Sequence, residues 1–375
     1  MKTDVAIVGG GIAGLSLALE LQKRGVHYQL FEASSEPGGL CNSWQDSQGY
    51  WHDYGPHIFH NFEGFKWFKE LLPRNETVEL LRNDDMKLSD GRIVSYPVQT
   101  SCVDLIEPEP SVKIMNYGDY CRHHYGSLLS SLFYFPWNEK IYNTHISNID
   151  ISVTSRVPAI AQPSGTYLYP SCGRFGALPE AMSERLLKNR KHYSSPVTYI
   201  DSKQQYLLGD IRCHYTLLVW AAPFRSLVTY LHLRPKFLRY SDLYLVTKKV
   251  GRGYLPGLAR YRADGVIEHR ESYEAVLKNN NDQFAQKEVN ADYMNRILEM
   301  ELNNLSDTAF VLPDAYVTPT IGWIKELSNI TCELRKQSIV LHGKSGTTIH
   351  KNIWPIVQDS MRLADEIKQI VYRRS

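Results

Sequence analysis

The chain has 375 residues, of which 43% are hydrophobic and 22% charged, and its formal net charge is +2. These values are typical of a globular protein and exclude a largely disordered chain. The basic residues are dispersed, which disfavours nucleic acid as a partner, and no apolar run reaches the length of a membrane span.

The first predicted element is a buried strand over residues 4–8, which breaks into Gly9, Gly11 and Gly14 and continues as a helix over residues 15–24. Glycines in this order let the backbone turn tightly and approach a pyrophosphate at the N-terminus of the helix. The pattern predicts a dinucleotide site. The alternative is a glycine-rich turn between strand and helix that binds nothing.

A second strand is predicted over residues 26–31, and it ends in Glu32. An acidic side chain at this place accepts hydrogen bonds from ribose hydroxyls, and its charge repels a 2′-phosphate. The ligand of this site is therefore predicted to be FAD or NAD, and NADP is disfavoured.

Residues 32–40 resemble the extended fingerprint of FAD enzymes in the amine-oxidase and protoporphyrinogen-oxidase superfamily. The adjacent glycines Gly38 and Gly39 leave backbone amides bare beside a phosphate. The superfamily usually has a basic residue just before this pair, whereas Glu36 and Pro37 stand there in this chain. The resemblance implies FAD, bound non-covalently.

The segment 51–60 resembles the Gly-Pro/Ala-His-Ile-Phe-His segment of UDP-galactopyranose mutases. The resemblance implies that the segment runs along the flavin ring and that His57 lies near the flavin N5 atom. The alternative is that His57 and His60 are core histidines, and for His60 this reading is the one we favour.

Several later segments resemble the same superfamily in order and spacing, and together they span most of the chain. They are residues 92–99, 135–142, 169–182, 195–197, 217–223 and 339–346.

The cofactor signals are interleaved with other sequence, which predicts an α/β fold with a discontinuous Rossmann-like (GR2-type) FAD-binding domain over 1–60, 165–230 and 335–375. The segments 61–164 and 231–334 are predicted to form an inserted α+β substrate domain, which covers the flavin.

Within the inserted segments, residues 112–133 are predicted to be helical, and residues 239–262 and 309–319 are predicted to be strands of a cover sheet. Residues 289–305 are predicted to form a surface helix and residues 279–282 a loop tip.

The resemblance assigns roles to individual residues. The predicted catalytic residues are His57, Tyr142 and Arg174, and the predicted substrate-binding residues are Tyr96, Trp137, Arg156, Tyr169 and His350. The predicted cofactor-binding residues are Gly9, Gly11, Ile12, Ala13, Gly14, Glu32, Ala33, Gly38, Gly39, Leu40, Pro56, His57, Val197, Ala221, Gly343 and Lys344.

The anion clamp that UDP-galactopyranose mutases use for their substrate is incomplete in this chain. Arg156 matches a family position, but no second arginine follows it, and Lys344 and His350 stand where the family has arginine and tyrosine. Lysine cannot reproduce the bidentate fork of arginine, so UDP-galactopyranose itself is disfavoured. Other cations are candidates for binding a different anion: Arg174, Arg260, Arg262 and Lys351.

Three functions follow. The first is an FAD-dependent oxidoreductase that acts on a small organic substrate, in specialised metabolism by analogy. The second is a redox-neutral mutase or isomerase that uses reduced FAD on a sugar nucleotide or a related substrate. The third is a protein that binds FAD and assists a partner without catalysing a reaction, and no feature of the sequence supports it. The incomplete clamp favours the first.

Six cysteines are scattered without a metal-ligand spacing, which predicts reduced thiols, a cytoplasmic location and no structural metal. Neither a signal peptide nor an integral membrane segment is predicted, and a homodimer is compatible with the sequence. The tyrosine-rich stretch 128–137 predicts a buried helix and loop, with a peripheral membrane contact as the alternative.

Overall fold

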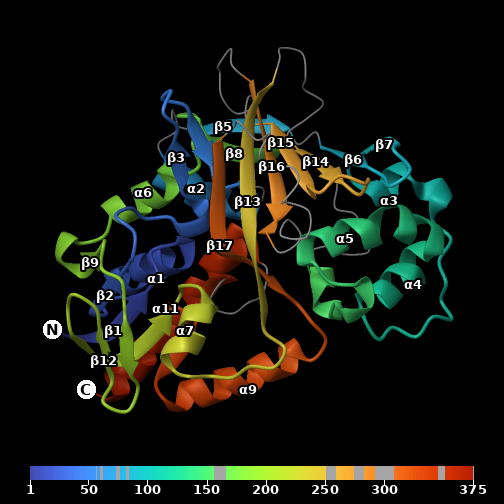
Figure 1. Cartoon of the computed structure of the whole chain (residues 1–375). Helices are drawn as coiled ribbons and strands as arrows, with labels where there is room; N and C mark the ends of the chain where they lie inside the picture. Colours follow the sequence, from blue (N-terminus) through green and yellow to red (C-terminus); the bar gives the residue numbers. More distant parts are fainter. Residues whose placement is uncertain are drawn as a thin grey trace.

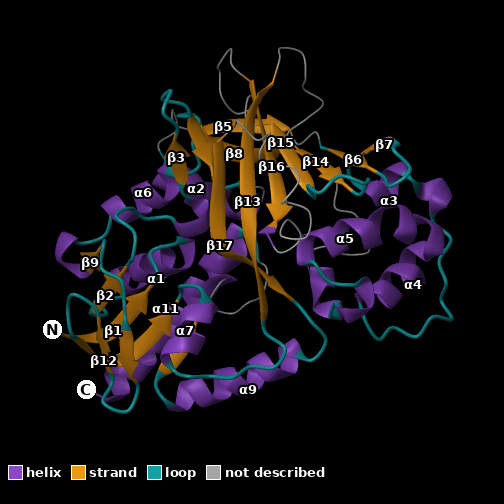
Figure 2. Cartoon of the chain, viewed as in Figure 1, coloured by secondary structure: helices purple, strands orange, loops and turns teal. Residues whose placement is uncertain are grey.

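The computed structural model describes residues 1–55, 57–59, 62–72, 77–81, 84–155, 166–250, 259–273, 283–291, 308–344 and 351–374. Two seven-stranded sheets dominate the described residues, and a group of helices lies beside the second sheet (Figure 1, Figure 2). The sequence prediction of an α/β protein with a Rossmann-like domain is confirmed.

The first sheet has the strand order β10–β11–β12–β1–β2–β9, and β18 pairs with β12. The strands β9, β2, β1 and β12 are parallel neighbours, and β18 is parallel to β12. The bounds are β1 Lys2–Val8, β2 Tyr28–Phe31, β9 Lys191–His192, β10 Tyr199–Asp201, β11 Tyr206–Leu208, β12 Cys213–Trp220 and β18 Ile339–Leu341.

Helices cover both faces of this sheet, which explains why the second half of β1, residues 5–8, is a continuous apolar run. Val5 and Ile7 of β1 pack in one cluster with α1 (Ile12–Lys23), α6 (Ala177–Glu184) and α11 (Ile353–Arg374). The alternate residues of β1, Ala6 and Val8, pack in a second cluster with α7 (Phe224–Tyr230) and α9 (Trp323–Lys336).

The second sheet has the order β17–β13–β16–β15–β14–β6–β7 and is antiparallel except where β6 pairs with β14. The bounds are β6 Asp85–Lys87, β7 Ile93–Ser95, β13 Arg239–Val250, β14 Ala259–Arg262, β15 Arg270–Tyr273, β16 Gln283–Asn290 and β17 Thr308–Thr318. Two small antiparallel sheets complete the strands: β3 (Ser43–Gln45) with β4 (Trp51–Asp53), and β5 (Thr77–Leu81) with β8 (Thr166–Pro170).

The remaining helices are α2 (Phe65–Leu71) and a helical lobe made of α3 (Val98–Ser101), α4 (Tyr117–Leu129) and α5 (Phe135–Tyr142), seen on the right of Figure 1. A π-helical turn joins α4 to α5. The lobe has its own core of buried aromatic and aliphatic side chains. Leu129, Phe133, Tyr134 and Trp137 of the stretch 128–137 lie in this core, whereas Leu128 is exposed.

The predicted strands at 239–262 and 309–319 are confirmed over their described residues as β13, β14 and β17. The helix predicted over 112–133 begins only at Tyr117, because the side chain of Asn116 accepts a hydrogen bond from the backbone of Asp119 and caps it there. The helix predicted from Val289 was wrong at its start, since Val289 pairs with β13 at the end of β16. The rest of that segment, and the loop tip at 279–282, lie outside the described residues.

The strands of the first sheet come from the segments 1–60, 165–230 and 335–375, and those of the second come from 61–164 and 231–334. One strand crosses this division, because β8 pairs with β5. The division of the chain into two domains stays a prediction.

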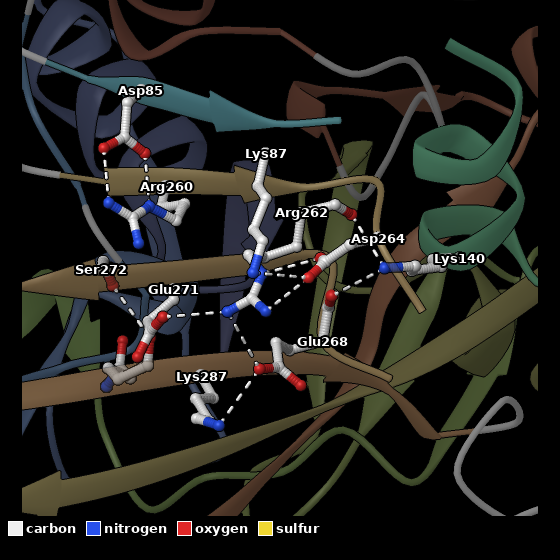
Figure 3. A network of polar contacts seen from close by, with 11 residues as sticks. Asp85, Lys87, Lys140, Arg260, Arg262, Asp264, Glu268, Glu271, Ser272 and Lys287 are labelled. Atoms are coloured by element: carbon white, nitrogen blue, oxygen red, sulfur yellow. Dashed lines mark hydrogen bonds and ion pairs between the residues drawn. The ribbon is translucent and has the colours of Figure 1, made fainter. Parts of the chain in front are cut away.

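A network of charged side chains ties the separate parts of the second sheet together (Figure 3). Arg260 on β14 makes two hydrogen bonds, of 2.6 and 2.8 Å, to Asp85 on β6. Arg262 bonds Asp264 at 2.9 and 2.8 Å and lies 3.3 Å from Glu271. Lys140 of α5 donates to the carbonyl of Arg262 at 2.9 Å, which attaches the helical lobe to the sheet.

Because Arg262 is buried, its replacement by alanine removes the counter-charge of Glu271 and leaves Asp264 and Glu268 with one cation each, Lys87 and Lys287. We expect Arg262→Ala to lower the free energy of unfolding by roughly 3 kcal/mol, measured by urea denaturation. The matched control is Arg92→Ala, since the side chain of Arg92 is 50% exposed and pairs with the exposed Asp90. This control should lose less than about 1 kcal/mol. Equal losses in the two variants would show that the network contributes nothing beyond a surface ion pair.

Candidate functional site

The segment from the end of β1 through the first turn of α1 requires glycine at two of its positions. Gly9 has a φ of +109°, and a Cβ on it would lie 2.7 Å from the backbone nitrogen of Ala222. A Cβ on Gly14 would lie 1.9 Å from the carbonyl oxygen of Gly9. The loop therefore closes tightly over the start of α1, as an anion-binding strand-to-helix turn does.

Glu32 lies at the end of β2, with its carboxylate against this loop. It accepts hydrogen bonds from the backbone N–H of Gly10 at 2.5 Å and from the backbone N–H of Ser34 at 2.9 Å. The backbone carbonyl of Glu32 accepts from the N–H of Ser195 at 2.8 Å. The structure thus brings together the acid and the glycine loop that the sequence predicts to act on one dinucleotide.

The glycine pair Gly38 and Gly39 lies against the same loop. Gly38 forms a parallel bridge with Gly11, and its N–H donates to the carbonyl of Gly10 at 2.8 Å. Both glycines have positive φ values, +124° and +52°. Side chains other than glycine would be strained here, so the pair allows a second backbone segment to approach the loop closely.

The turn after β18 completes the site from the C-terminal part of the chain. Gly343 has a φ of +73°, and a Cβ on it would lie 2.3 Å from the Cβ of Ala13. Ala221, at the end of β12, donates its N–H to the carbonyl of Val8 at 2.8 Å. Five segments that are remote in sequence therefore meet at one end of the first sheet.

The other predicted cofactor residues surround this point with different degrees of exposure. Ile12, Ala13 and Val197 are buried, Leu40 is half-buried, and Ala33 is exposed. Pro56 lies outside the described residues.

His57 is half-buried, and its Nε2 atom lies 3.0 Å from the carbonyl oxygen of Tyr54. Burial, together with the positive charges of Lys344 and Arg270, lowers the pKa of His57 to about 4. The ring is therefore neutral at pH 7. The ammonium group of Lys344 lies 5.2 Å from the centre of the Tyr316 ring, in a cation–π contact.

An ion pair that the sequence analysis missed faces His57 from the second sheet. Arg270 makes two hydrogen bonds, each 2.8 Å long, to the fully buried Glu288, and the hydroxyl of Tyr316 lies 3.4 Å from the same carboxylate. Burial raises the pKa of Glu288, but the charges and hydrogen bonds of Arg270 and His269 together outweigh it, so the net pKa falls to about 2. A Cβ on Gly55 would lie 3.5 Å from this carboxylate.

Asp53 is a second missed residue, and it fixes the segment that leads to His57. Its side chain accepts hydrogen bonds from the Ser43 hydroxyl at 2.5 Å, from the N–H of Phe175 at 2.8 Å and from the hydroxyl of Tyr169. Tyr169 is fully buried. Its burial favours a structural role over the substrate contact predicted from the sequence.

The remaining predicted catalytic and substrate residues lie in other surroundings. Tyr142 and Trp137 are buried in the core of the helical lobe, and Tyr96 is half-buried against Tyr261. Arg174 bonds Glu180 through both of its terminal nitrogens and lies over the Trp51 ring. Arg156 and His350 lie outside the described residues. Within the described part of the chain, no group of three or more His, Cys, Asp or Glu residues is arranged to hold a metal ion.

The comparisons with known proteins agree with this geometry. The model of the NAD(P)-binding Rossmann-like domain family matches residues 7–74. The zeta-carotene desaturase of Synechocystis sp. is 46% identical over 55 residues, which are 15% of this chain and 11% of the desaturase. The matched part of the chain thus spans only about a tenth of the length of this relative.

Solved structures resemble the whole chain. Reduced UDP-galactopyranose mutase superposes with a TM-score of 0.82 at 18% identity, and the match covers 98% of this chain and 96% of that chain. Putrescine oxidase bound to putrescine superposes with a TM-score of 0.67 at 12% identity, over 98% and 99% of the two chains.

The fold and the loop geometry together define a protein with a Rossmann-like domain, and the family model that matches it is described as NAD(P)-binding. More specifically, the whole chain has the fold of reduced UDP-galactopyranose mutase and of putrescine oxidase.

The lowered pKa of His57 predicts a pH dependence of stability. An unfolded histidine has a pKa near 6.5, so between pH 6.5 and 4 the unfolded chain binds more protons than the folded chain, and stability falls as the pH falls. We expect His57 to contribute roughly 1–3 kcal/mol to this fall, measured by urea denaturation at several pH values.

The variant His57→Gln should show a smaller decrease of stability over the same range of pH. His145→Gln is the control, because the His145 side chain is 70% exposed. An unchanged pH dependence in His57→Gln would contradict the assignment of a neutral, buried ring.

Proposed function

We propose that the protein is an FAD-dependent oxidoreductase that acts on a small organic substrate. The observation that carries the proposal is the contact of Glu32 with the glycine loop, which forms a dinucleotide site at the end of a parallel sheet. The desaturase and oxidase names among the similar proteins support the class of reaction.

The residues around the loop fit FAD. The loop from Gly9 to Gly14 would hold the pyrophosphate at the start of α1, and Glu32 would bind the adenosine ribose. The glycine pair beside Gly11 adds a second backbone segment next to the phosphates. The turn at Gly343 approaches Ala13 closely enough that no side chain fits between them. The cofactor would therefore extend from Glu32 toward His57 and Lys344.

A bound flavin supplies the capacity to take a hydride from a C–H bond. The protein's own groups supply binding and electrostatics. His57 is neutral at pH 7 and has a ring nitrogen that can hold a proton, and Lys344 contributes a positive charge beside it. The Arg270–Glu288 pair lies beside Gly55, two residues before His57.

The other cations form ion pairs within the chain, which supports a substrate without a large anionic group. Four cations that the sequence offers as anion ligands are ion-paired within the chain. These pairs are Arg174 with Glu180, Arg260 with Asp85, Arg262 with Asp264 and Lys351 with Asp359. Breaking a buried pair to bind a diphosphate would leave a carboxylate uncompensated. This arrangement argues against a sugar nucleotide as the substrate.

The second candidate is a redox-neutral mutase or isomerase that uses reduced FAD. The likeness to reduced UDP-galactopyranose mutase over nearly the whole chain favours it. The non-covalent attachment of FAD, the cytoplasmic location and the homodimer stay predictions from the sequence. Among the described helices, none combines the length and the apolar character needed to cross a membrane.

The role of Glu32 gives a direct prediction. Replacing Glu32 by alanine removes a charged acceptor for ribose hydroxyls, so FAD affinity should fall roughly tenfold or more, measured by titration of the apoprotein and flavin fluorescence. Glu36→Ala is the matched control, since Glu36 is exposed and lies four residues further along the same segment. Unchanged affinity in Glu32→Ala would show that the ribose binds elsewhere.

Anaerobic mixing separates the two candidate functions. The flavin-loaded protein is mixed with primary amines, alcohols and polyenes, and separately with UDP-galactopyranose, before and after reduction with dithionite. We expect an organic substrate to bleach the oxidised flavin, which means hydride removal. Conversion of UDP-galactopyranose only after reduction, with the flavin left reduced, would instead identify a mutase.

A further inference from the structure

A chain of buried hydrogen bonds lies directly beneath the proposed cofactor site and has no part in the proposed chemistry. It begins at His342, the residue before Gly343, which is 3% exposed. The Nε2 atom of His342 lies 2.7 Å from the hydroxyl of Ser360 on α11, and that hydroxyl lies 2.7 Å from the hydroxyl of Ser16 on α1.

The chain of bonds ends on the backbone of the first turn of α1. The Ser16 hydroxyl donates to the carbonyls of Ile12 at 2.7 Å and Ala13 at 3.1 Å. The His342 ring also makes a hydrogen bond to the backbone of Ala13. These contacts connect the end of β18, the helix α11 and the N-terminus of α1, which are three elements that meet at the glycine loop.

We propose that His342 is a positioning residue for the dinucleotide, because its imidazole holds the Gly343–Lys344 turn against the start of α1. This inference rests on the proposed flavin site. The ring joins the first turn of α1, which would contact the pyrophosphate, to the Gly343–Lys344 turn, which would contact the flavin end of the cofactor. We call this set of contacts the joint at His342. Loosening it would displace both segments together. The close contact of Gly343 with Ala13 leaves no room for the turn to shift toward α1.

The ring is also the group in this joint whose charge changes between neutral and acidic pH. Burial lowers the pKa of His342 to about 4, which agrees with a neutral ring in a closed site. The charged groups that act on it are Asp359 of α11 and Lys351, which form an ion pair with each other. On α1 the hydroxyl of Ser16 faces the ring, and Glu20, one turn further, bonds Lys23 and Arg24. Acid should therefore weaken the joint and release the cofactor.

The test is FAD retention as a function of pH in the flavin-loaded, full-length protein. Wild type, His342→Gln, His342→Ala and the exposed control His145→Gln are dialysed at pH values from 7.5 to 4.5, and released flavin is measured by fluorescence. Glutamine does not titrate, and its amide can either donate to the Ser360 hydroxyl through nitrogen or accept from it through oxygen. We expect His342→Gln to keep flavin at pH 7.5 and to lower the pH of half-release by roughly one unit.

Two further measurements make the outcome unambiguous. His342→Ala should lose flavin at every pH, and hydrogen exchange of the first turn of α1 should rise in His342→Ala but not in His145→Gln. Superimposable release curves for wild type and His342→Gln would overturn the proposal, as would unchanged exchange in α1. A wild-type protein that binds no FAD at pH 7.5 would overturn the flavin site itself, which is a different result.

Discussion

The structure depends on a close approach of backbone segments at one end of the first sheet. A Cβ on Gly9 would collide with the backbone of Ala222, and a Cβ on Gly343 would collide with Ala13. The glycine pair Gly38–Gly39, whose φ values are positive, lies against the glycine loop at van der Waals distance. These segments meet where the backbone N–H of Gly10 donates to the carboxylate of Glu32. The proposed cofactor site and the joint at His342 both depend on this approach.

The second sheet contributes a different kind of constraint. Its strands carry many charged residues, and these are satisfied by one another: Arg270 by Glu288, Arg260 by Asp85, and Arg262 by its acidic neighbours. Such pairs hold the strand register and the helical lobe in place. They also occupy Arg260 and Arg262, which supports the proposal of a substrate without a large anionic group.

The sequence predicted those parts of the site that depend on neighbours along the chain. The glycine loop and Glu32 belong to one strand–helix–strand unit, whose local pattern specifies both the turn and the acid at its end. Arg270 and Glu288 could not be paired from the sequence, because their contact depends on the register between β15 and β16. The joint at His342 joins residues up to 344 positions apart, and no local signal marks Ser16 or Ser360. Arg174 and Tyr169 were predicted to act on substrate, but their partners, Glu180 and Asp53, become visible only in the fold.

We propose that the site formed by the glycine loop and Glu32 holds FAD. The most direct test is the visible absorption spectrum of the purified protein, followed by acid release of the bound molecule and determination of its mass. The account predicts the two-band spectrum of oxidised flavin and the mass of intact FAD in the released fraction, close to one FAD per chain. A colourless protein that also fails to take up FAD after incubation would contradict the account, and release of NAD in place of a flavin would assign the site to the other dinucleotide.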